Sequence, residues 1–177
     1  MTESNILLTG KPGIGKTTVI KRTVELLSCS STGFYTREIK RGDPRVGFEI
    51  ISLQTGERLP LAHTDFTTAE DRVGKYGVKA ENLLGFLKEI NEAMTSNKPQ
   101  CLVIDEIGKM EFFTPGFHET VDKAFQSSYP LLATIMKKSH KFCDYLKNRG
   151  DTDVIEVTEN NRDDLPEKLA KRIEEQL

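Results

Sequence analysis

The chain has 177 residues, and 25 Lys and Arg stand against 27 Asp and Glu for a formal net charge of -2. That length suits a single domain over residues 1–177 with a substantial core, and the interspersed charges argue against DNA or RNA as a partner. The 3 cysteines include no CxxC pair, and no apolar run approaches the roughly 20 residues of a membrane span. We therefore expect a cytoplasmic protein with reduced thiols, no zinc site and no membrane contact.

A glycine-rich segment, "GKPGIGKTT" at residues 10–18, follows the short apolar run "NILLT" at residues 5–9. Its spacing fits GxxxxGK followed by Ser or Thr, the pattern of a loop whose backbone N–H groups hold phosphate. Apolar residues at helical spacing predict a helix directly after it, with its positive end facing the loop. An ordinary turn is the alternative, but helix starts favour acids and none is nearby. The predicted nucleotide-binding residues are Gly10, Lys11, Pro12, Gly13, Ile14, Gly15, Lys16, Thr17 and Thr18.

The next part of the chain is rich in strand-forming residues. "GFYTREIK" at residues 33–40 and "VGFEIISL" at residues 46–53 are joined by "RGDPR", whose Gly and Pro mark a turn, so an antiparallel hairpin is predicted. "RLPLAH" at residues 58–63 is predicted as a third short strand. Residues 64–79 are polar, contain glycines and show no clear period, so we expect a long loop there.

Helix and strand patterns alternate through the rest of the chain. Leu83, Leu87, Ile90 and Met94 share one helical face, and Ser96 begins a polar segment that ends the helix. The further predicted elements are a buried strand at 101–105, a helix at 116–127, a buried strand at 131–136, a short helix from a Ser139 cap to Lys147, and a strand at 153–158. This alternation predicts an α/β fold with a mostly parallel sheet flanked by helices, to which the hairpin is an antiparallel addition.

A final helix is predicted from its cap and its apolar face. Asn160 or Asn161 is the expected cap, and Asp163 and Asp164 suit the first turn because acids stabilise the positive end of a helix. Its predicted buried face consists of Leu165, Leu169, Ile173 and Leu177.

"CLVIDEIGKMEFF" at residues 101–113 places two acids at the end of an apolar strand, where open α/β sheets bind their ligands. We expect Asp105 to hold Mg²⁺ together with the Thr17 hydroxyl, and Glu106 to orient an attacking water. Lys16 is the predicted catalytic cation and is expected to face solvent in the empty loop. A solvated acidic strand end is the alternative. The predicted Walker B residues are Cys101, Leu102, Val103, Ile104, Asp105, Glu106, Ile107 and Gly108.

Three further residues have a functional and a structural interpretation. Lys109 could reach the transferred phosphoryl group or be a surface cation. Thr134 could contact the terminal phosphate or the water, although Thr is common in strands for its shape. Arg162 could stack on a nucleobase or contact phosphate, or pair with Asp163 or Asp164. The histidines are scattered, which argues against a histidine metal site and predicts solvent exposure for His63, His118 and His140.

The segments "GKPGIGKTT", "GFYTREI", "RVGFEIISL", "VGKYGV", "LVIDEIGKME" and "ENNRDDLP" together resemble the THEP-type nucleoside-triphosphatases, and the likeness spans nearly the whole chain. The resemblance implies a P-loop NTPase fold and Mg²⁺-dependent hydrolysis of ATP, GTP, CTP and UTP to diphosphate and phosphate, with low base selectivity. The phosphate loop of the family falls on residues 10–17 and its Walker B strand on residues 101–108.

Two other functions are compatible with the sequence. A small-molecule or nucleotide kinase is suggested by the size of the chain and by residues 64–79, which could close over an acceptor. A nucleotide-switched binding module is the second alternative, in which the hairpin holds a partner. The carboxylate of Glu106 beside Asp105 favours hydrolysis, because it suits activation of water.

Overall fold

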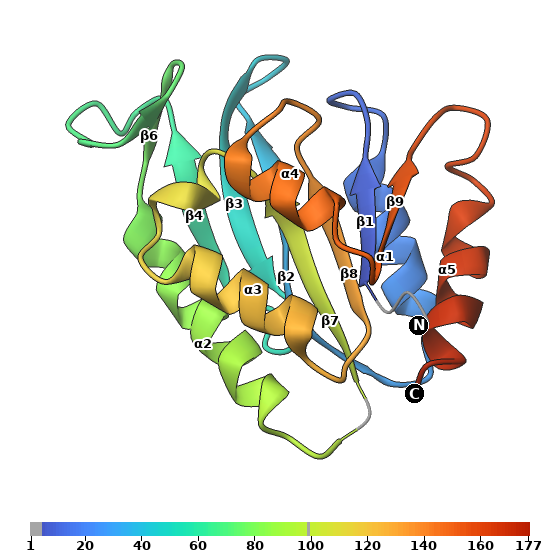
Figure 1. Cartoon of the computed structure of the whole chain (residues 1–177). Coiled ribbons are helices and arrows are strands. Elements are labelled where there is room, and N and C mark those ends of the chain that lie inside the picture. Colours follow the sequence, from blue (N-terminus) through green and yellow to red (C-terminus); the bar gives the residue numbers. More distant parts are fainter. Residues whose placement is uncertain (1–4, 99) are drawn as a thin grey trace.

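A computed structural model describes residues 5–98 and 100–177, whose nine strands form one sheet with helices on both faces (Figure 1). The strand order is β5-β6-β4-β3-β2-β7-β8-β1-β9. The strands are β1 (Asn5–Thr9), β2 (Ser30–Lys40), β3 (Arg45–Ser52), β4 (Arg58–His63), β5 (Arg72–Val73), β6 (Tyr76–Val78), β7 (Gln100–Ile107), β8 (Leu131–Ile135) and β9 (Thr152–Glu156). The helices are α1 (Lys16–Leu26), η1 (Ala80–Leu83), α2 (Leu84–Met94), η2 (Glu111–Phe113), α3 (Phe117–Gln126), α4 (Lys141–Lys147) and α5 (Leu165–Glu174). Across these ranges, no helix is both long and apolar enough to cross a membrane.

One part of the sheet is parallel. β2, β7, β8, β1 and β9 each pair in parallel with their neighbours in this series. Their carboxyl ends lie together along the upper edge of the sheet in Figure 1. β8 lies between β1 and β7, so the strand before the glycine-rich loop and the strand that carries Asp105 are separated by one strand. The predicted α/β class is confirmed.

The antiparallel part of the sheet is larger than one hairpin. β2 and β3 form the predicted hairpin, and β4 adds the predicted third strand. The expectation of a loop over residues 64–79 is wrong in part, because this segment contains β5 and β6, which pair with each other, while β6 also pairs with β4. Gly74, at φ 57°, allows the tight turn between them, and the buried side chains of Tyr76 and Val78 hold β6 on the core. Strands of two and three residues are too short to show a period in the sequence.

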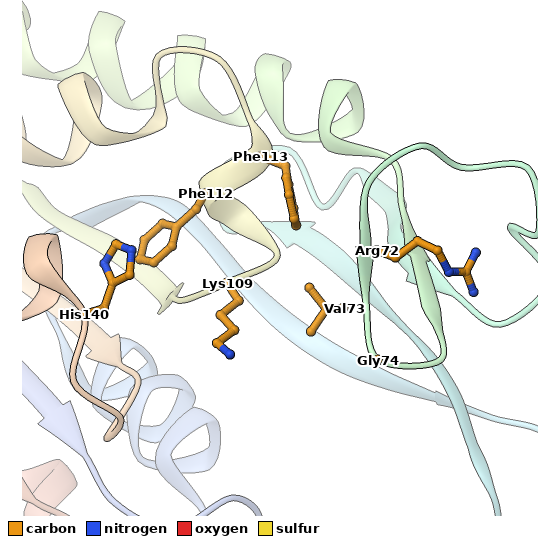
Figure 2. A pocket seen from close by; sticks show the side chains of 7 residues that line it. All are labelled: Arg72, Val73, Gly74, Lys109, Phe112, Phe113 and His140. Atoms are coloured by element: carbon orange, nitrogen blue, oxygen red, sulfur yellow. The ribbon is translucent and has the colours of Figure 1, made fainter.

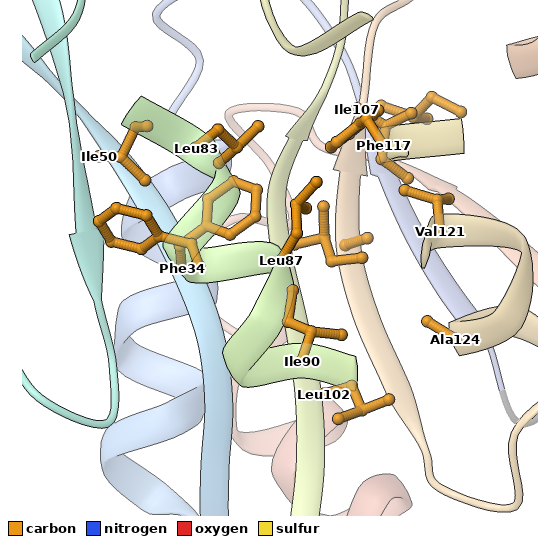
Figure 3. Packing of buried hydrophobic residues seen from close by; sticks show 14 of the residues in the cluster. Phe34, Ile50, Leu83, Leu87, Ile90, Leu102, Ile107, Phe117, Val121 and Ala124 are labelled. Carbon is orange, nitrogen blue, oxygen red and sulfur yellow. The ribbon is translucent and has the colours of Figure 1, made fainter. Parts of the chain in front are cut away.

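Strand β7 illustrates how helices cover both faces of the sheet. Leu102 and Ile104 belong to a core cluster formed with α2 and α3, whereas Cys101 and Val103 belong to a second cluster formed with α1 and α5. Figure 3 shows the first cluster, in which Leu87 of α2 lies among the side chains that cover the sheet. Both faces of β7 are therefore buried, which accounts for its continuous apolar run.

The predicted cap of α4 is wrong by one residue. His140, rather than Ser139, is the cap, and its Nδ1 accepts a hydrogen bond of 3.3 Å from the backbone N–H of Phe142. The Ser139 hydroxyl instead donates to Oδ2 of Asp144 at 2.5 Å. An imidazole nitrogen can accept the hydrogen bond at this position, although Ser, Thr, Asp and Asn are the residues that sequence rules favour as caps.

The start and end of α5 also differ from the prediction. Asp164 occupies the cap position without a side-chain hydrogen bond, so Asp163 and Asp164 precede the helix. The Asn161 side chain does not cap the helix; it accepts from the N–H of Thr158 at 2.8 Å and donates to the carbonyl of Glu156 at 2.9 Å. Leu177 lies beyond the helix and is 46% exposed, so only the first three residues of the predicted apolar face are buried.

The prediction that the three histidines are solvent exposed is wrong. The His63 side chain is 14% exposed and accepts a hydrogen bond from the N–H of Asp65. His118 and His140 both stack on the ring of Phe112, with ring centroids 4.9 and 4.5 Å from it. Their positions are far apart in the sequence, so only the packing of α3 and α4 brings them together.

Candidate active site

The glycine-rich loop connects β1 to the start of α1 at the carboxyl edge of the sheet. Gly10, Gly13 and Gly15 have φ values of 146°, 77° and 110°, which side chains rarely adopt, so the glycines are required by the path of the backbone. A Cβ on Gly10 would lie only 2.8 Å from the carbonyl oxygen of Val157. No side chain caps α1, and its first turn contains no acid. The positive end of the helix is thus left for an anion.

The expectation that Lys16 faces solvent in the empty loop is wrong in part, because its side chain is half-buried. Its Nζ donates hydrogen bonds to the backbone carbonyls of Gly10 and Lys11, each at 3.2 Å, and so connects the end of the loop to its beginning. The ammonium group is therefore held over the loop before any phosphate is bound. Binding of an anion there would exchange these two neutral acceptors for charged ones, which form stronger hydrogen bonds.

Asp105 is the centre of a buried hydrogen-bond network at the end of β7. Its side chain is almost fully buried and accepts from the Thr17 hydroxyl at 2.7 Å, the Thr134 hydroxyl at 2.5 Å and the Thr36 N–H at 3.3 Å. Burial raises the pKa of Asp105, and the hydrogen bonds from Thr134, Thr17 and Thr36 oppose this rise. The carboxylate thus joins α1, β8 and β2 at one point. Thr36 was missed from the sequence, because a threonine in a hairpin strand has no chemical signature.

The Thr17 hydroxyl and the Asp105 carboxylate fit a Mg²⁺ ion that binds together with a nucleotide. Both supply the hard oxygen ligands that Mg²⁺ prefers, and they already touch. Within the described ranges, no group of three or more His, Cys, Asp or Glu side chains could hold a metal by itself. Mg²⁺ is usually held by one or two protein oxygens together with phosphates and waters, and this pair offers that arrangement.

Two further carboxylates lie beside Asp105. Burial and the charge of Asp105 raise the pKa of Glu106 to about 7, while Lys16 opposes this rise. Glu111 is also buried, and burial together with Glu106 raises its pKa well above the usual value. A Cβ on Gly108 would lie 2.8 Å from Oε1 of Glu106 and 3.2 Å from Oε2 of Glu111. The absence of a side chain at Gly108 therefore allows both carboxylates to pack against its backbone. Glu111 was not predicted as a site residue; an acid inside the apolar run "MEFF" is the signal that could have found it.

Arg162 lies against the phosphate loop, the position that its functional interpretation requires, and it precedes α5. Its Nη1 donates to the carbonyl of Ile14 at 3.3 Å, and its side chain passes close to Gly15. Asp163 forms its ion pair with Arg22 instead, at 3.9 Å. In the described part of the chain, no ion pair joins Arg162 to Asp163 or Asp164. The alternative of a surface salt bridge is therefore not observed.

In the described structure, no hydrogen bond or ion pair joins the Lys109 side chain to the phosphate loop. It is exposed and lies in a pocket beside Phe112 and Phe113, on the segment that follows β7 (Figure 2). The predicted residues therefore fall into two groups. Thr17, Asp105, Thr134 and Arg162 are held on or beside the loop by hydrogen bonds, whereas Lys109 lines a neighbouring space.

A model of the NTPase family matches residues 5–170 of this chain. The chain belongs to the NTPase family. Curated relatives in this family include the nucleoside-triphosphatase THEP1 of Thermotoga maritima, 43% identical over 90% of each chain, and that of Thermofilum pendens, 42% identical over 98% of this chain and 97% of the relative.

Solved structures of NTPase-family proteins show the same fold. The crystal structure of THEP1 from Aquifex aeolicus matches with a TM-score of 0.83 at 30% identity, over 96% of this chain and 99% of that one. The solution structure of a human cancer-related nucleoside triphosphatase matches with a TM-score of 0.79 at 30% identity, over 97% of each chain. The likeness thus includes the antiparallel part of the sheet. The predicted membership of the THEP-type enzyme family is confirmed.

Proposed function

We propose that the chain forms one P-loop domain that hydrolyses nucleoside triphosphates to diphosphate and phosphate, with Mg²⁺ as cofactor and low base selectivity. The observation that carries this proposal is the 2.7 Å hydrogen bond from the Thr17 hydroxyl to Asp105, with Glu106 as the next residue. This hydrogen bond joins the start of α1, the helix after the phosphate loop, to an acid on β7. β7 is separated by β8 from β1, the strand that leads into the loop. The names of the relatives support the same reaction class.

Each residue has a defined role in this proposal. The backbone N–H groups of residues 10–18 and the ammonium of Lys16 bind the phosphates and stabilise the negative charge of the transition state. Thr17 and Asp105 would hold Mg²⁺, which when bound neutralises charge on the terminal phosphates. Thr134 fixes the Asp105 carboxylate through its hydrogen bond. Lys109 is a secondary proposal for contact with the transferred phosphoryl group.

Glu106 is the proposed acceptor for the attacking water. A carboxylate with a pKa of about 7 can accept a proton near neutral pH, whereas one with an ordinary pKa of 4.5 is a much weaker base. As water attacks the terminal phosphorus, its proton passes toward Glu106 and the bond to the leaving diphosphate oxygen breaks. The charge of Glu106 in turn raises the pKa of the neighbouring Glu111, which burial raises further.

Low base selectivity follows from the group proposed to meet the base. Arg162 lies against the loop, and its guanidinium can stack on any of the four bases because each has a π face. We therefore expect ATP, GTP, CTP and UTP to be hydrolysed at rates within roughly one to two orders of magnitude of each other. A single accepted nucleotide would contradict this expectation.

The test is release of free phosphate from each triphosphate, with and without Mg²⁺ and without any added acceptor. Steady release that needs Mg²⁺ supports the proposal. Release or product formation only after addition of a small-molecule acceptor would favour the kinase alternative instead. Release that requires a macromolecule from a cell extract would favour the nucleotide-switched binding module.

A further inference from the structure

A separate pocket of about 390 Å³ opens between the segment after β7 and the β5–β6 hairpin (Figure 2). Of the described residues, none from 10–18 lines it, so it is not the phosphate loop itself. Its volume lies within the range of small-molecule sites. The hairpin that forms one wall lies within residues 64–79, the segment first expected to be an open loop.

Aromatic rings and apolar groups form opposite walls of this pocket. Phe112 stacks on His140 on one side, and Phe113 and Val73 lie on the other, with Lys109 between them (Figure 2). Phe113 is 39% exposed, so part of its ring is free to contact a bound molecule. Walls of this kind suit a flat ring, because stacked and edge-on aromatic contacts are favourable.

The polar groups of the pocket are donors. The amine of Lys109 has no ion-pair partner within the described residues, so its charge remains available. His140 uses Nδ1 as acceptor for the N–H of Phe142, and a neutral His140 therefore carries its proton on Nε2. None of the lining residues is acidic in the part of the chain that the structure describes. A bound molecule is thus expected to present acceptors or negative charge.

Arg72 contributes its side-chain stem rather than its charge. Its guanidinium donates to the carbonyls of Phe66 and Lys75 at 3.2 and 3.1 Å, and Figure 2 shows it directed away from Lys109. Among the lining residues described, Lys109 is therefore the cation whose charged group faces the pocket. The single positive charge of Lys109 can balance one anionic group on a bound molecule.

We propose that this pocket binds a small, flat aromatic molecule that carries one anionic group, with its ring against Phe113 and its anion at Lys109. The proposal goes beyond the hydrolysis of nucleotides, because ring binding involves no residue of the phosphate loop. The same segment carries Gly108, which packs on the carboxylates of Glu106 and Glu111. The occupant would therefore lie on the segment that directly follows the strand carrying Glu106, the proposed water-positioning group.

The test uses benzoate as a flat aromatic anion, with cyclohexanecarboxylate and benzylamine as matched probes that lack the flat ring or the negative charge. Each probe is titrated into a sample of ¹⁵N-labelled protein with Mg²⁺ and a non-hydrolysable ATP analogue, so that the analogue occupies the phosphate loop. We expect benzoate to shift the amide signals of Lys109, Phe112 and Phe113. The affinity for each of the two matched probes should be lower by a factor of at least about 10, the equivalent of roughly 1.4 kcal/mol in binding free energy.

Two variants and a control locate the interaction. Lys109→Met removes the charge and keeps the stem, and Phe113→Leu keeps apolar volume and removes the ring; both should weaken benzoate binding several-fold. Lys138→Met, on an exposed residue outside the pocket, should leave it unchanged. Equal affinity for benzoate and cyclohexanecarboxylate, or unchanged benzoate binding in Lys109→Met, would overturn the proposal.

The proposed nucleotide site and the pocket fail in different ways. If the ATP analogue leaves the signals of Gly13 and Gly15 unshifted, the nucleotide site is contradicted, and the benzoate titration still reports on the pocket. If benzoate shifts only residues 10–18, it binds as a simple anion to the loop and the pocket proposal is overturned. Shifts at Phe112 and Phe113 in the presence of bound analogue support both sites.

Discussion

The Thr134 hydroxyl donates a hydrogen bond of 2.5 Å to Oδ1 of Asp105, a residue 29 positions earlier on the neighbouring strand. The other carboxylate oxygen of Asp105 accepts from Thr17 and from the N–H of Thr36. Every oxygen of this buried acid is thus occupied by a fixed donor. An unsatisfied buried carboxylate oxygen would be costly, so the orientation of Asp105 depends on these three contacts.

Replacement of Thr134 by Val should separate this positioning role from a structural one. The variant keeps the β-branched shape and leaves Oδ1 of Asp105 without its donor, so we expect the Mg²⁺ concentration for half-maximal phosphate release to rise about 10-fold. Thr134→Ser retains the hydroxyl and should restore the native Mg²⁺ requirement. A lower melting temperature with an unchanged Mg²⁺ requirement would show that Thr134 serves only the stability of β8.

The adjacent acids should respond differently to neutral replacement. Asp105→Asn removes charge from the proposed metal site and should weaken binding of Mg²⁺ with nucleotide. Glu106→Gln retains size and polarity, so a fluorescent triphosphate analogue should still bind with near-native affinity while phosphate release falls about 100-fold or more. Lost binding with an unchanged rate at saturation in Glu106→Gln would identify Glu106 as a metal or structural residue.

Lys16→Ala should abolish turnover with a small effect on the fold. The variant loses the charge that stabilises the transition state, for which we expect a decrease in phosphate release of at least about 100-fold. It also loses the contacts of Nζ with Gly10 and Lys11, partly exposed bonds worth about 1 kcal/mol or less each in the free energy of unfolding. Phosphate release and thermal unfolding of the variant check both points. Lys168→Ala, at an exposed position of α5, is the matched control and should retain native values.

Glu111→Gln should stabilise the empty protein at high pH and not at low pH. Glu111 has its pKa raised well above 4.5 in the folded chain, so the folded state holds a proton that the unfolded state has lost. The contribution of Glu111 to stability therefore falls as the pH rises above 4.5 and is lowest once the pH exceeds the raised value. The amide of the variant does not ionise and avoids this loss.

Thermal unfolding at two pH values tests this prediction. At pH 8, without nucleotide or metal, we expect Glu111→Gln to raise Tm by roughly 2–4 °C, the shift that about 1 kcal/mol produces in a chain of this size. Near pH 3.5 the difference should vanish, because Glu111 is then protonated in the folded chain and largely so in the unfolded one. Glu159→Gln, an exposed acid, should show no such difference. A lower Tm for Glu111→Gln at pH 8 would mean that the ionised carboxylate stabilises the fold.

The phosphate loop, the parallel strands and the pairing of Thr17 with Asp105 could be predicted from the sequence because their causes are local or follow from simple topology. The glycines at 10, 13 and 15 are required by the positive φ values of a short segment, and the apolar run at 101–105 is the pattern of a strand buried on both faces. Once both segments end at the carboxyl edge of one parallel sheet, their polar ends meet.

Other features depend on contacts between residues that are distant in the sequence and ordinary in kind. Thr36 meets Asp105 across 69 positions, Glu111 is buried against Glu106 by the fold of a short 3-10 helix, and Phe112 stacks between His118 and His140 only because α3 and α4 pack beside it. No local pattern marks such residues. Their burial, their partners and the pocket beside Lys109 were decided by the tertiary structure, since the energy of a buried contact depends on which surfaces the packed elements bring together.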